Sequence, residues 1–264
     1  MNLDGKVAII TGSGGKGTGR AVARRFAQEG MAVVVSDINE AGGDETVALI
    51  EADRGRAAFH PADVKNENEI NGLIAFAEST FGGLDILVNN ASQPDTMGLL
   101  TGWMDAMAVE ILAPMRSTLA AIEAMRRRGG GAIVNIGSTS ALGHGHQHSP
   151  WPAYDVGKMA QIRLTTTLAG LRDQENIRVN CLVPAWIASP GPKEYWQSLT
   201  PEQRRLRGVP DTLLSLQEVA GAVLRLATDE ALFGRIMVWW NGQPPQFISQ
   251  GDPGFQTLDW RASP

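Results

Sequence analysis

The alternation of short apolar runs with longer amphipathic stretches constrains the fold of this chain more than any other feature of its sequence. Apolar, partly β-branched runs predict strands, and apolar residues spaced three or four apart predict helices. Strands that are apolar on both faces, each followed by a helix, form a parallel sheet that is covered on both sides. The sequence therefore predicts an α/β fold, a doubly wound parallel sheet with helices on both faces. Predicted strands cover 7–11, 32–36, 57–60, 84–89, 132–136, 177–183 and 236–239, and predicted helices cover 20–28, 40–52, 66–81, 103–128, 153–173 and 217–228.

No break in composition divides the 264 residues, so we expect a single domain over 1–264. The segment 185–216 has no clear pattern and follows the carboxyl end of a predicted strand, where ligands bind in such sheets. It is therefore a candidate substrate lid. The segment 242–264 is expected to be an irregular C-terminal tail.

Charge and hydropathy restrict the partners of this chain. A net charge of −5 argues against nucleic acid or an anionic membrane. No apolar run is long enough to span a membrane, and the first residues do not resemble a signal peptide. The single cysteine, Cys181, excludes an intrachain disulfide and fits a reducing cytoplasm, and in a buried strand we expect it to be inert.

A glycine-rich stretch, TGSGGKGTGR over 11–20, joins the first predicted strand to the first predicted helix. In this position Gly12, Gly17 and Gly19 would let backbone N–H groups approach a pyrophosphate, although the composition also suits a flexible turn. Asp37, at the end of the second strand, would bind the ribose hydroxyls of NAD and repel the 2′-phosphate of NADP, and it also suits a helix N-cap. Lys16 is either a partner for that phosphate or a solvated loop residue. We give Asp37 more weight and expect NAD, with NADP as the alternative.

Tyr154 and Lys158 stand four residues apart in a predicted helix, which puts them on one face. A nearby ammonium stabilises a phenolate and lowers the pKa of the tyrosine, so the pair suits acid–base chemistry near neutral pH. The same spacing also occurs on ordinary amphipathic helices. Tyr154 and Tyr195 are the two tyrosines of the chain.

With these residues, the order of several further motifs makes the chain resemble the short-chain dehydrogenase/reductase family over about residues 3–242. The matching motifs are Asp63-Val64, NNAS over 89–92, Ser138, and NCLVPA over 180–185. The resemblance implies a Rossmann fold in which Tyr154 is the general acid–base, Lys158 binds the nicotinamide ribose, and Ser138 binds the substrate oxygen. It also implies a homo-oligomer, a tetramer. The cofactor-binding residues that it implies are Gly12, Lys16, Gly17, Thr18, Gly19, Asp37, Ile38, Asp63, Val64, Asn89, Ala91, Tyr154, Lys158, Pro184, Ile187 and Ser189.

The chain departs from the family pattern at its glycine loop and at Glu110. The second gap of the loop, 13–16, is one residue longer than usual, so we expect the loop to bulge. Glu110 stands where the family often has an asparagine that helps to hold a relay water. Pro114 has no N–H and clashes with the carbonyl four residues earlier, so the Glu110 carbonyl loses its helical partner. We expect that carbonyl to bind the relay water and the carboxylate to pair with Lys158; the alternative is a Glu110 that faces solvent or a partner subunit.

Aromatic and histidine side chains gather in the segments expected to border the substrate. Trp151, Trp186, Tyr195 and Trp196 either line the cleft, which would favour a bulky, apolar ligand, or pack within the lid. The alternating His144, His146 and His148 do not define a tetrahedral metal site, so we expect no metal. His144 is instead a candidate substrate contact, with Ser138, and His60 is expected to be structural.

The sequence therefore predicts an NAD(P)-dependent oxidoreductase that acts on a secondary alcohol or ketone, a small-molecule substrate. One alternative is an NAD(P)-binding protein with a regulatory or scaffolding role. Another is a reductase of an imine or a C=C bond.

Overall fold

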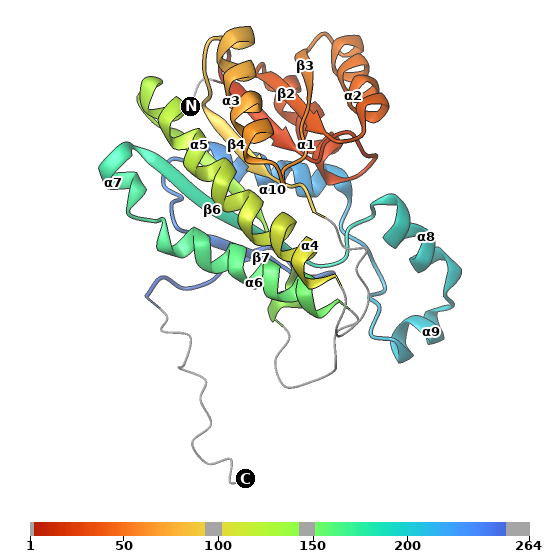
Figure 1. Cartoon of the computed structure of the whole chain (residues 1–264). Helices are drawn as coiled ribbons and strands as arrows, with labels where there is room; N and C mark the ends of the chain where they lie inside the picture. The colour runs from red at the N-terminus through yellow and green to blue at the C-terminus, as the bar shows by residue number, and fades with distance from the viewer. Residues whose placement is uncertain (1–2, 93–101, 143–150, 252–264) are drawn as a thin grey trace.

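A computed structural model describes residues 3–92, 102–142 and 151–251 of the chain. In this part of the chain, eight strands form one sheet in the order β3-β2-β1-β4-β5-β6-β7-β8 (Figure 1). The pairs from β3 to β7 are parallel, and β8 joins the edge antiparallel to β7. The predicted doubly wound parallel sheet is confirmed. The strands are β1 (Val7–Thr11), β2 (Ala32–Asp37), β3 (Arg56–Pro61), β4 (Ile86–Asn89), β5 (Gly131–Ile136), β6 (Ile177–Pro184), β7 (Ile236–Trp239) and β8 (Gln246–Phe247).

Helices cover both faces of this sheet because successive strand residues point to opposite sides and are apolar on both. Ala8 and Ile10 of β1 pack in a core with helices α1 and α10, whereas Val7 and Ile9 pack in a core with α3 and α5. Figure 1 shows α5 and α6 on one side of the sheet and α10 on the other. The helices are α1 (Thr18–Gln28), α2 (Glu40–Ala52), α3 (Glu67–Phe81), α4 (Trp103–Met107), the π-helical turn η1 (Ala108–Leu112), α5 (Ala113–Arg127), the 3₁₀ turn η2 (Thr139–Leu142), α6 (Pro152–Thr167), α7 (Leu171–Glu175), α8 (Pro190–Ser198), α9 (Pro201–Leu206) and α10 (Leu216–Thr228).

Four predicted segments differ from the structure. The segment 185–216 is not irregular, because it contains α8 and α9. Thr200 and Gln203 form a capping box at the start of α9, a helix signal that the sequence carried. The predicted helix 103–128 changes to π geometry over η1, and the predicted tail contains β8. The predicted helix 153–173 is divided into α6 and α7.

The parallel strands end at one edge of the sheet, and the loops that leave this edge hold the glycine loop, the NNAS segment and Ser138. Because ligands bind beyond the carboxyl ends of such strands, this edge is the expected place for a cofactor and a substrate. The fold therefore brings together motifs that are far apart along the chain.

Candidate active site

The longer glycine loop is held against β2 and does not bulge freely. The backbone N–H of Ser13 donates to the carbonyl of Ser36 (3.1 Å), and the Ser36 N–H donates to Ser13 Oγ (3.1 Å). Ser13 Oγ also donates to the carbonyl of Ile10 (2.7 Å). The next residue, Gly14, donates its N–H to Asp37 Oδ2 (2.8 Å). The additional residue thus extends the contact of β1 with β2 before the chain turns toward α1.

The three glycines singled out from the sequence have different reasons to be glycine. Gly12 has a φ of +65°, and a Cβ there would lie 2.7 Å from the Cα of Ala91. A Cβ on Gly19 would overlap the carbonyl oxygen of Gly12. A Cβ on Gly17 would meet only the side chain of Ser189, at 3.8 Å. The protein itself therefore requires Gly12 and Gly19, whereas Gly17 keeps open the space between the loop and Ser189.

The N-terminus of α1 has the form that a dinucleotide phosphate requires. Gly17 is the N-cap of α1, and no side chain caps this end, so its first-turn N–H groups face outward beside the open space; Thr18 is the first helical residue. These backbone donors and the missing Cβ fit the pyrophosphate of a nicotinamide dinucleotide.

Arg20 connects the glycine loop to α2, a role that the sequence analysis did not assign. Its buried guanidinium donates to the carbonyl of Gly14 (2.8 Å), to Thr46 Oγ1 (2.9 Å) and to Glu45 Oε2 (2.8 Å). The only sequence signal was an arginine inside an otherwise apolar helix face. Arg20 fixes the loop from beneath and leaves its outer N–H groups available for a ligand.

Asp37 lies at the carboxyl end of β2 and faces the glycine loop. Besides the Gly14 N–H, its carboxylate accepts the N–H of Asn39 (2.9 Å). Asn39, not Asp37, is the N-cap of α2, since its side chain accepts from Gly42. Lys16 is exposed in the loop, and its charge lowers the pKa of Glu45 after the larger effect of Arg20. Asp37 is therefore a fixed anion at the ribose end of the expected cofactor site.

The two asparagines of the NNAS segment hold neighbouring parts of the site by hydrogen bonds. Asn89 was expected to line the cofactor cleft, but its side chain is buried and bonds Asn135 (2.9 Å) and Ser117 (2.7 Å). Asn90, which sequence reasoning passed over, donates to the carbonyls of Thr11 (2.9 Å) and Gly12 (3.0 Å). Asn89 thus joins β4 to β5 and α5, and Asn90 holds the start of the glycine loop.

The remaining expected cofactor residues follow the ends of neighbouring strands. Ile38 is exposed after β2, Asp63 and Val64 are half-buried after β3, and Ala91 follows β4 beside Gly12. Pro184 ends β6, and Ile187 and Ser189 follow it, with Ser189 as the N-cap of α8. These positions surround the same edge of the sheet as the glycine loop.

Tyr154 and Lys158 lie on one face of α6, as their spacing predicts. The Lys158 ammonium is 5.3 Å from the centroid of the Tyr154 ring and donates to the carbonyl of Ile136 (2.8 Å). Ser138 lies after β5, close enough to Tyr154 for a hydrogen bond that lowers the pKa of the phenol. Ser138 Oγ also bonds Ser140 Oγ (2.9 Å). The three side chains meet although they come from two elements.

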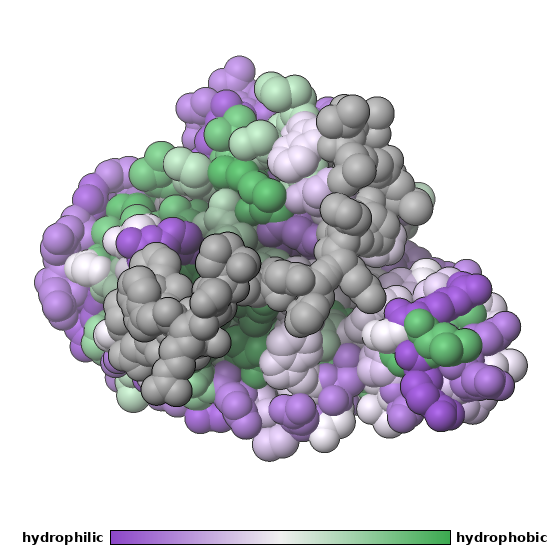
Figure 2. Space-filling model, turned by 90° about the horizontal axis from the view of Figure 1, so that it is seen from below, coloured by the Kyte–Doolittle hydropathy of each residue, from purple (hydrophilic) through white to green (hydrophobic). Residues whose placement is uncertain are grey.

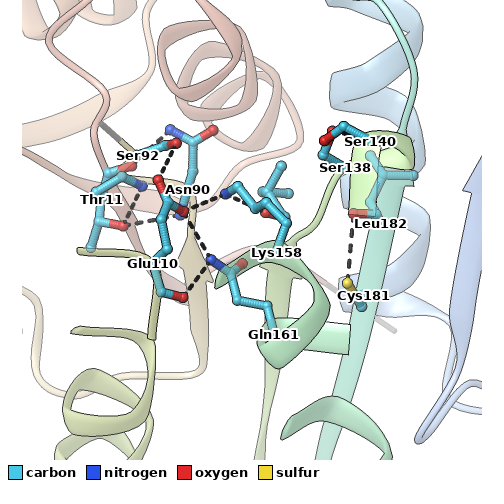
Figure 3. Close-up of polar contacts among 12 residues, drawn as sticks. Thr11, Asn90, Ser92, Glu110, Ser138, Ser140, Lys158, Gln161, Cys181 and Leu182 are labelled. Atoms are coloured by element: carbon cyan, nitrogen blue, oxygen red, sulfur yellow. Dashed lines mark hydrogen bonds and ion pairs between the residues drawn. The ribbon is translucent and has the colours of Figure 1, made fainter. Parts of the chain in front are cut away.

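Glu110 completes this group from the π-helical turn (Figure 3). Its carboxylate pairs with Lys158 (Oε2–Nζ, 2.9 Å), and both side chains are buried, at 0% and 2% exposure. Its carbonyl accepts from the amide of Gln161 (2.9 Å). Pro114 lies at the start of α5 and supplies no N–H to that carbonyl. The carbonyl therefore accepts from the Gln161 amide, a partner that the sequence analysis did not assign.

The pKa values of Tyr154 and Lys158 are both raised, for different reasons. Burial lowers the pKa of the Lys158 ammonium, but the opposite charges of Glu110 and Tyr154 outweigh burial and raise it. Burial raises the pKa of the Tyr154 phenol, Lys158 lowers it, and Glu110 raises it again. The net pKa of Tyr154 lies above its ordinary value. Burial is the largest cause, and Glu110 opposes the effect that the charge of Lys158 has on this phenol.

The sequence profile described as short chain dehydrogenase matches residues 6–199 of this chain. The chain belongs to the short-chain dehydrogenase family. The resemblance drawn from the sequence motifs is thereby confirmed, and the chain is an oxidoreductase that uses a nicotinamide cofactor.

Other members of the family share most of the length of this short-chain dehydrogenase. An uncharacterized oxidoreductase from Thermotoga maritima is 36% identical over 247 residues, which cover 88% of this chain and 94% of the relative. Dehydrogenase/reductase SDR family member 4 from Homo sapiens is 32% identical over 254 residues, 92% of this chain and 88% of that protein. A solved 7 alpha-hydroxysteroid dehydrogenase complexed with NADH and 7-oxo glycochenodeoxycholic acid has a TM-score of 0.80 and 32% identity, and the match covers 90% of this chain and 94% of that chain.

The aromatic residues near the substrate side of this short-chain dehydrogenase divide into two groups. Trp196 packs within the α8–α9 segment, because its indole donates to the carbonyl of Pro210 (2.9 Å) and Arg204 stacks on its ring at 3.5 Å. Trp186 and Tyr195 form a stacked pair with centroids 6.1 Å apart. Trp151 is the N-cap residue of α6, three residues before Tyr154, and it is exposed. Trp196 is therefore a packing residue, and the other three remain candidates for substrate contact.

Two further expectations concern histidine and the membrane. His144, His146 and His148 lie outside the described residues. Within 3–92, 102–142 and 151–251, no group of three or more His, Cys, Asp or Glu side chains is placed to hold a metal ion. His60 stacks on Phe76 with centroids 4.7 Å apart.

None of the described helices has the length and apolar character to cross a membrane.

Proposed function

We propose that this short-chain dehydrogenase moves a hydride between NAD(H) and a secondary alcohol or ketone, with Tyr154 as the acid–base. The observation that carries the proposal is the buried Lys158 ammonium, 5.3 Å from the Tyr154 ring centroid, beside the Ser138 hydroxyl. A protein that only binds a dinucleotide has no need of a serine, a tyrosine and a lysine arranged in this way. When bound, the nicotinamide supplies or accepts the hydride.

The chain supplies the proton and holds the substrate oxygen. Ser138 orients that oxygen by a hydrogen bond, and Tyr154 gives its proton to a ketone or takes one from an alcohol. Lys158 holds the nicotinamide ribose and stabilises the phenolate by its charge. Because the Tyr154 pKa is raised in the chain alone, the phenol is protonated at neutral pH and is ready to act as an acid.

NAD is the proposed cofactor because of the fixed anion Asp37. Its carboxylate is held by the N–H groups of Gly14 and Asn39, so it cannot move far from a ribose at the end of β2. A 2′-phosphate at that place would meet a like charge. Lys16 is exposed and can turn to solvent, so it compensates this repulsion poorly.

The proposed substrate is bulky and largely apolar. The stacked Trp186 and Tyr195 on the segment 185–216 offer a flat apolar wall, and we propose this segment as the substrate lid. Figure 2 shows hydrophobic surface in the middle of one face, bordered by hydrophilic surface. The solved relatives named as hydroxysteroid dehydrogenases agree with a substrate of this size.

A homo-oligomer, a tetramer, is the proposed assembly. Large apolar side chains are exposed on α4, η1, α5 and α6, where a second copy would cover them. They are Met104, Leu112, Met115, Leu119, Val156 and Met159.

A cofactor-coupled absorbance screen tests the proposed function. NAD⁺ and NADP⁺ are offered with secondary alcohols of increasing bulk, and the reverse direction is offered with ketones, imines and activated alkenes. We expect turnover with NAD⁺ and the bulkier alcohols, and a loss of roughly 10²–10⁴-fold in Tyr154→Phe while NAD binding persists. Full activity of Tyr154→Phe contradicts the mechanism, and turnover confined to imines or alkenes contradicts the substrate class.

A further inference from the structure

A cavity of about 180 Å³ lies at the amino ends of β1, β4, β5 and β6, at the opposite edge of the sheet from the glycine loop and Ser138. Its wall also includes the residues that follow α5, and Arg172 of α7. Figure 1 shows α7 on the side of the molecule away from α8 and α9. The cavity is therefore separate from the candidate active site.

The wall of this cavity carries more cations than anions. Among the described residues, four cationic side chains and two carboxylates line it, an excess of two positive charges in a chain whose net charge is −5. The cations are Lys6, Arg128, Arg172 and Arg178, and the carboxylates are Asp85 and Glu230. Because charges of one sign in a recess concentrate the field there, the wall favours an anionic ligand.

On one side of the cavity, Asp85 already has its counter-charges. Its carboxylate pairs with Lys6 Nζ (2.9 Å) and Arg128 Nη2 (3.0 Å), and it accepts the N–H of Val7 (2.9 Å). Asp85 is buried, whereas the side chains of Lys6 and Arg128 are about one-third exposed. Asp85 therefore holds two cations at the cavity and balances the charge of only one.

On the other side, a buried arginine has hydrogen bonds but no counter-charge. The guanidinium of Arg178 donates to the carbonyls of Ala227 (2.7 Å) and Asp229 (2.9 Å) at the end of α10. Among the described residues, no carboxylate forms an ion pair with Arg178 or with Arg172. Carbonyl groups supply only partial charges, and buried charges are normally paired. This side of the cavity therefore lacks a full negative charge.

The guanidinium groups of Arg172 and Arg178 lie close enough to repel each other. Burial lowers the pKa of Arg178, and the nearby charges of Glu230 and Asp229 raise it. The charge of Arg172 then lowers it further. An anion between the two arginines would replace this repulsion by two attractions.

We propose that this cavity binds a small oxyanion of the phosphate class, held by Arg172 and Arg178 and faced by Lys6 and Arg128. Guanidinium groups bind phosphate oxygens by pairs of parallel N–H···O bonds. The cavity is smaller than the roughly 300–1,000 Å³ of sites for drug-sized ligands, so it suits an ion or a single phosphoryl group. The bound anion would join α7, β6 and the residues after α5, and would thereby stabilise the fold. The proposal does not depend on the proposed function.

Thermal unfolding with inorganic phosphate is the first test, with sodium chloride added to keep the ionic strength constant. We expect Tm to rise by roughly 3–6 °C at ten times the Kd for phosphate. The glycine loop is the other place where phosphate could bind, so the titration is repeated with saturating NAD⁺. A rise that disappears with NAD⁺, or that chloride alone reproduces, overturns the proposal.

A second anion distinguishes the source of the phosphoryl group. Glycerol 3-phosphate carries the same phosphoryl chemistry on a small organic molecule. A larger rise in Tm than with inorganic phosphate supports a phosphate monoester as the ligand, and an equal or smaller rise supports the free ion. If neither anion changes Tm, the cavity does not bind this class of ligand.

Arg172→Gln tests whether the anion lies in this cavity. Arg172 is half-buried and forms no ion pair among the described residues, so the variant should fold like the parent chain. Losing one charge-assisted hydrogen bond should weaken phosphate binding by about 10- to 100-fold. Arg56→Gln is the matched control, because Arg56 is exposed at the start of β3, at the same end of the sheet but outside the cavity wall. Equal phosphate affinity in the two variants, measured by calorimetry, overturns the proposal.

Glu230→Gln should change the affinity in the opposite direction. Glu230 is an exposed carboxylate at the cavity and repels an anion bound there. Its neutralisation should strengthen phosphate binding by about two- to fivefold, the size expected of an exposed charge. A cavity with a merely structural role predicts no such gain. Unchanged or weaker phosphate binding in Glu230→Gln contradicts an anion at this place.

Discussion

Gly157 of α6 lies directly against Glu110, and a Cβ at position 157 would overlap the Cβ of Glu110. The glycine between Tyr154 and Lys158 is thus required by a residue that is remote in sequence. It lets the π-helical turn approach α6 closely enough for the Glu110 carboxylate to reach Lys158. The close approach of these two elements is what makes the buried ion pair possible.

We therefore expect Gly157→Ala to separate Glu110 from Lys158. Inserting a methyl group into a tight contact lowers the free energy of unfolding by about 1–3 kcal/mol. Because the Glu110–Lys158 ion pair is displaced as well, kcat should fall by more than the loss of folded protein accounts for. Gly221→Ala is the matched control, because Gly221 lies in α10 with open space around its Cβ position. That variant should be stabilised by about 0.5–1 kcal/mol with full activity. Thermal unfolding measures the stability of the two variants, and kcat measures their activity. The same stability and the same kcat in Gly157→Ala and Gly221→Ala would refute the packing argument.

Removing the charge of Glu110 should lower the pKa of Tyr154. Burial, then Lys158 and then Glu110 are the largest influences on that phenol, and Glu110 raises its pKa. In Glu110→Gln the phenolate faces an ammonium without its counter-charge, so it should form at lower pH. Because the chain has only two tyrosines, Tyr195→Phe leaves Tyr154 as the sole source of phenolate absorbance. Alcohol oxidation needs the phenolate, so the acid limb of its pH–rate profile should also shift to lower pH in Glu110→Gln. An unshifted phenolate titration would contradict the coupling between Glu110 and Tyr154.

Neutralising Asp37 should reduce the preference for NAD. Asp37→Asn removes the like charge that a 2′-phosphate would meet. The ratio of kcat/KM for NAD⁺ over NADP⁺ should fall by at least about tenfold, which corresponds to only about 1.4 kcal/mol. Lys16→Ala is the control, since an exposed loop lysine should leave that ratio almost unchanged. A ratio that falls in Lys16→Ala but not in Asp37→Asn would reverse the assignment.

Asp85 should make the free energy of unfolding depend on pH in the acidic range. Burial raises the pKa of the Asp85 carboxyl, but hydrogen bonds from Lys6, the Val7 N–H and Arg128 outweigh it and lower the pKa overall. A carboxyl whose pKa is lower in the folded state stabilises the fold above its unfolded pKa, and this stability is lost as pH falls through the folded value. Asp85→Asn should cost about 1.5–3 kcal/mol at pH 7 and flatten the decline below about pH 4. Urea unfolding between pH 3 and 7 measures the difference, and parallel curves for both proteins would exclude this role.

Cys181 should be unreactive while the chain is folded. Burial raises the pKa of its thiol to about 12, so almost no thiolate is present at pH 8. A thiol reagent at pH 8 should label the native protein slowly and the urea-unfolded protein fully. Rapid labelling of the folded protein would show that β6 opens or that the thiol is accessible.

Local sequence patterns were sufficient for the framework of the site. The apolar strands, the positive φ of Gly12, and the four-residue spacing of Tyr154 and Lys158 depend on the local chain. Periodicity and backbone sterics therefore predict them. The weaker predictions concerned segments such as 185–216, where short helices depend on a cap like that of Thr200 more than on apolar periodicity.

The sequence by itself determined the parallel sheet, the glycine-rich turn between β1 and α1, and the Tyr154–Lys158 face. Only the tertiary structure decided between the two alternatives for Glu110, in favour of the pair with Lys158. It also decided that Ser13 extends the contact of β1 with β2 and that Asn89 is a buried link between strands. Each of these contacts joins residues that are far apart along the chain. A buried polar side chain takes whichever partner the packed elements bring within hydrogen-bond distance, and that partner follows from the positions of whole strands and helices rather than from local spacing.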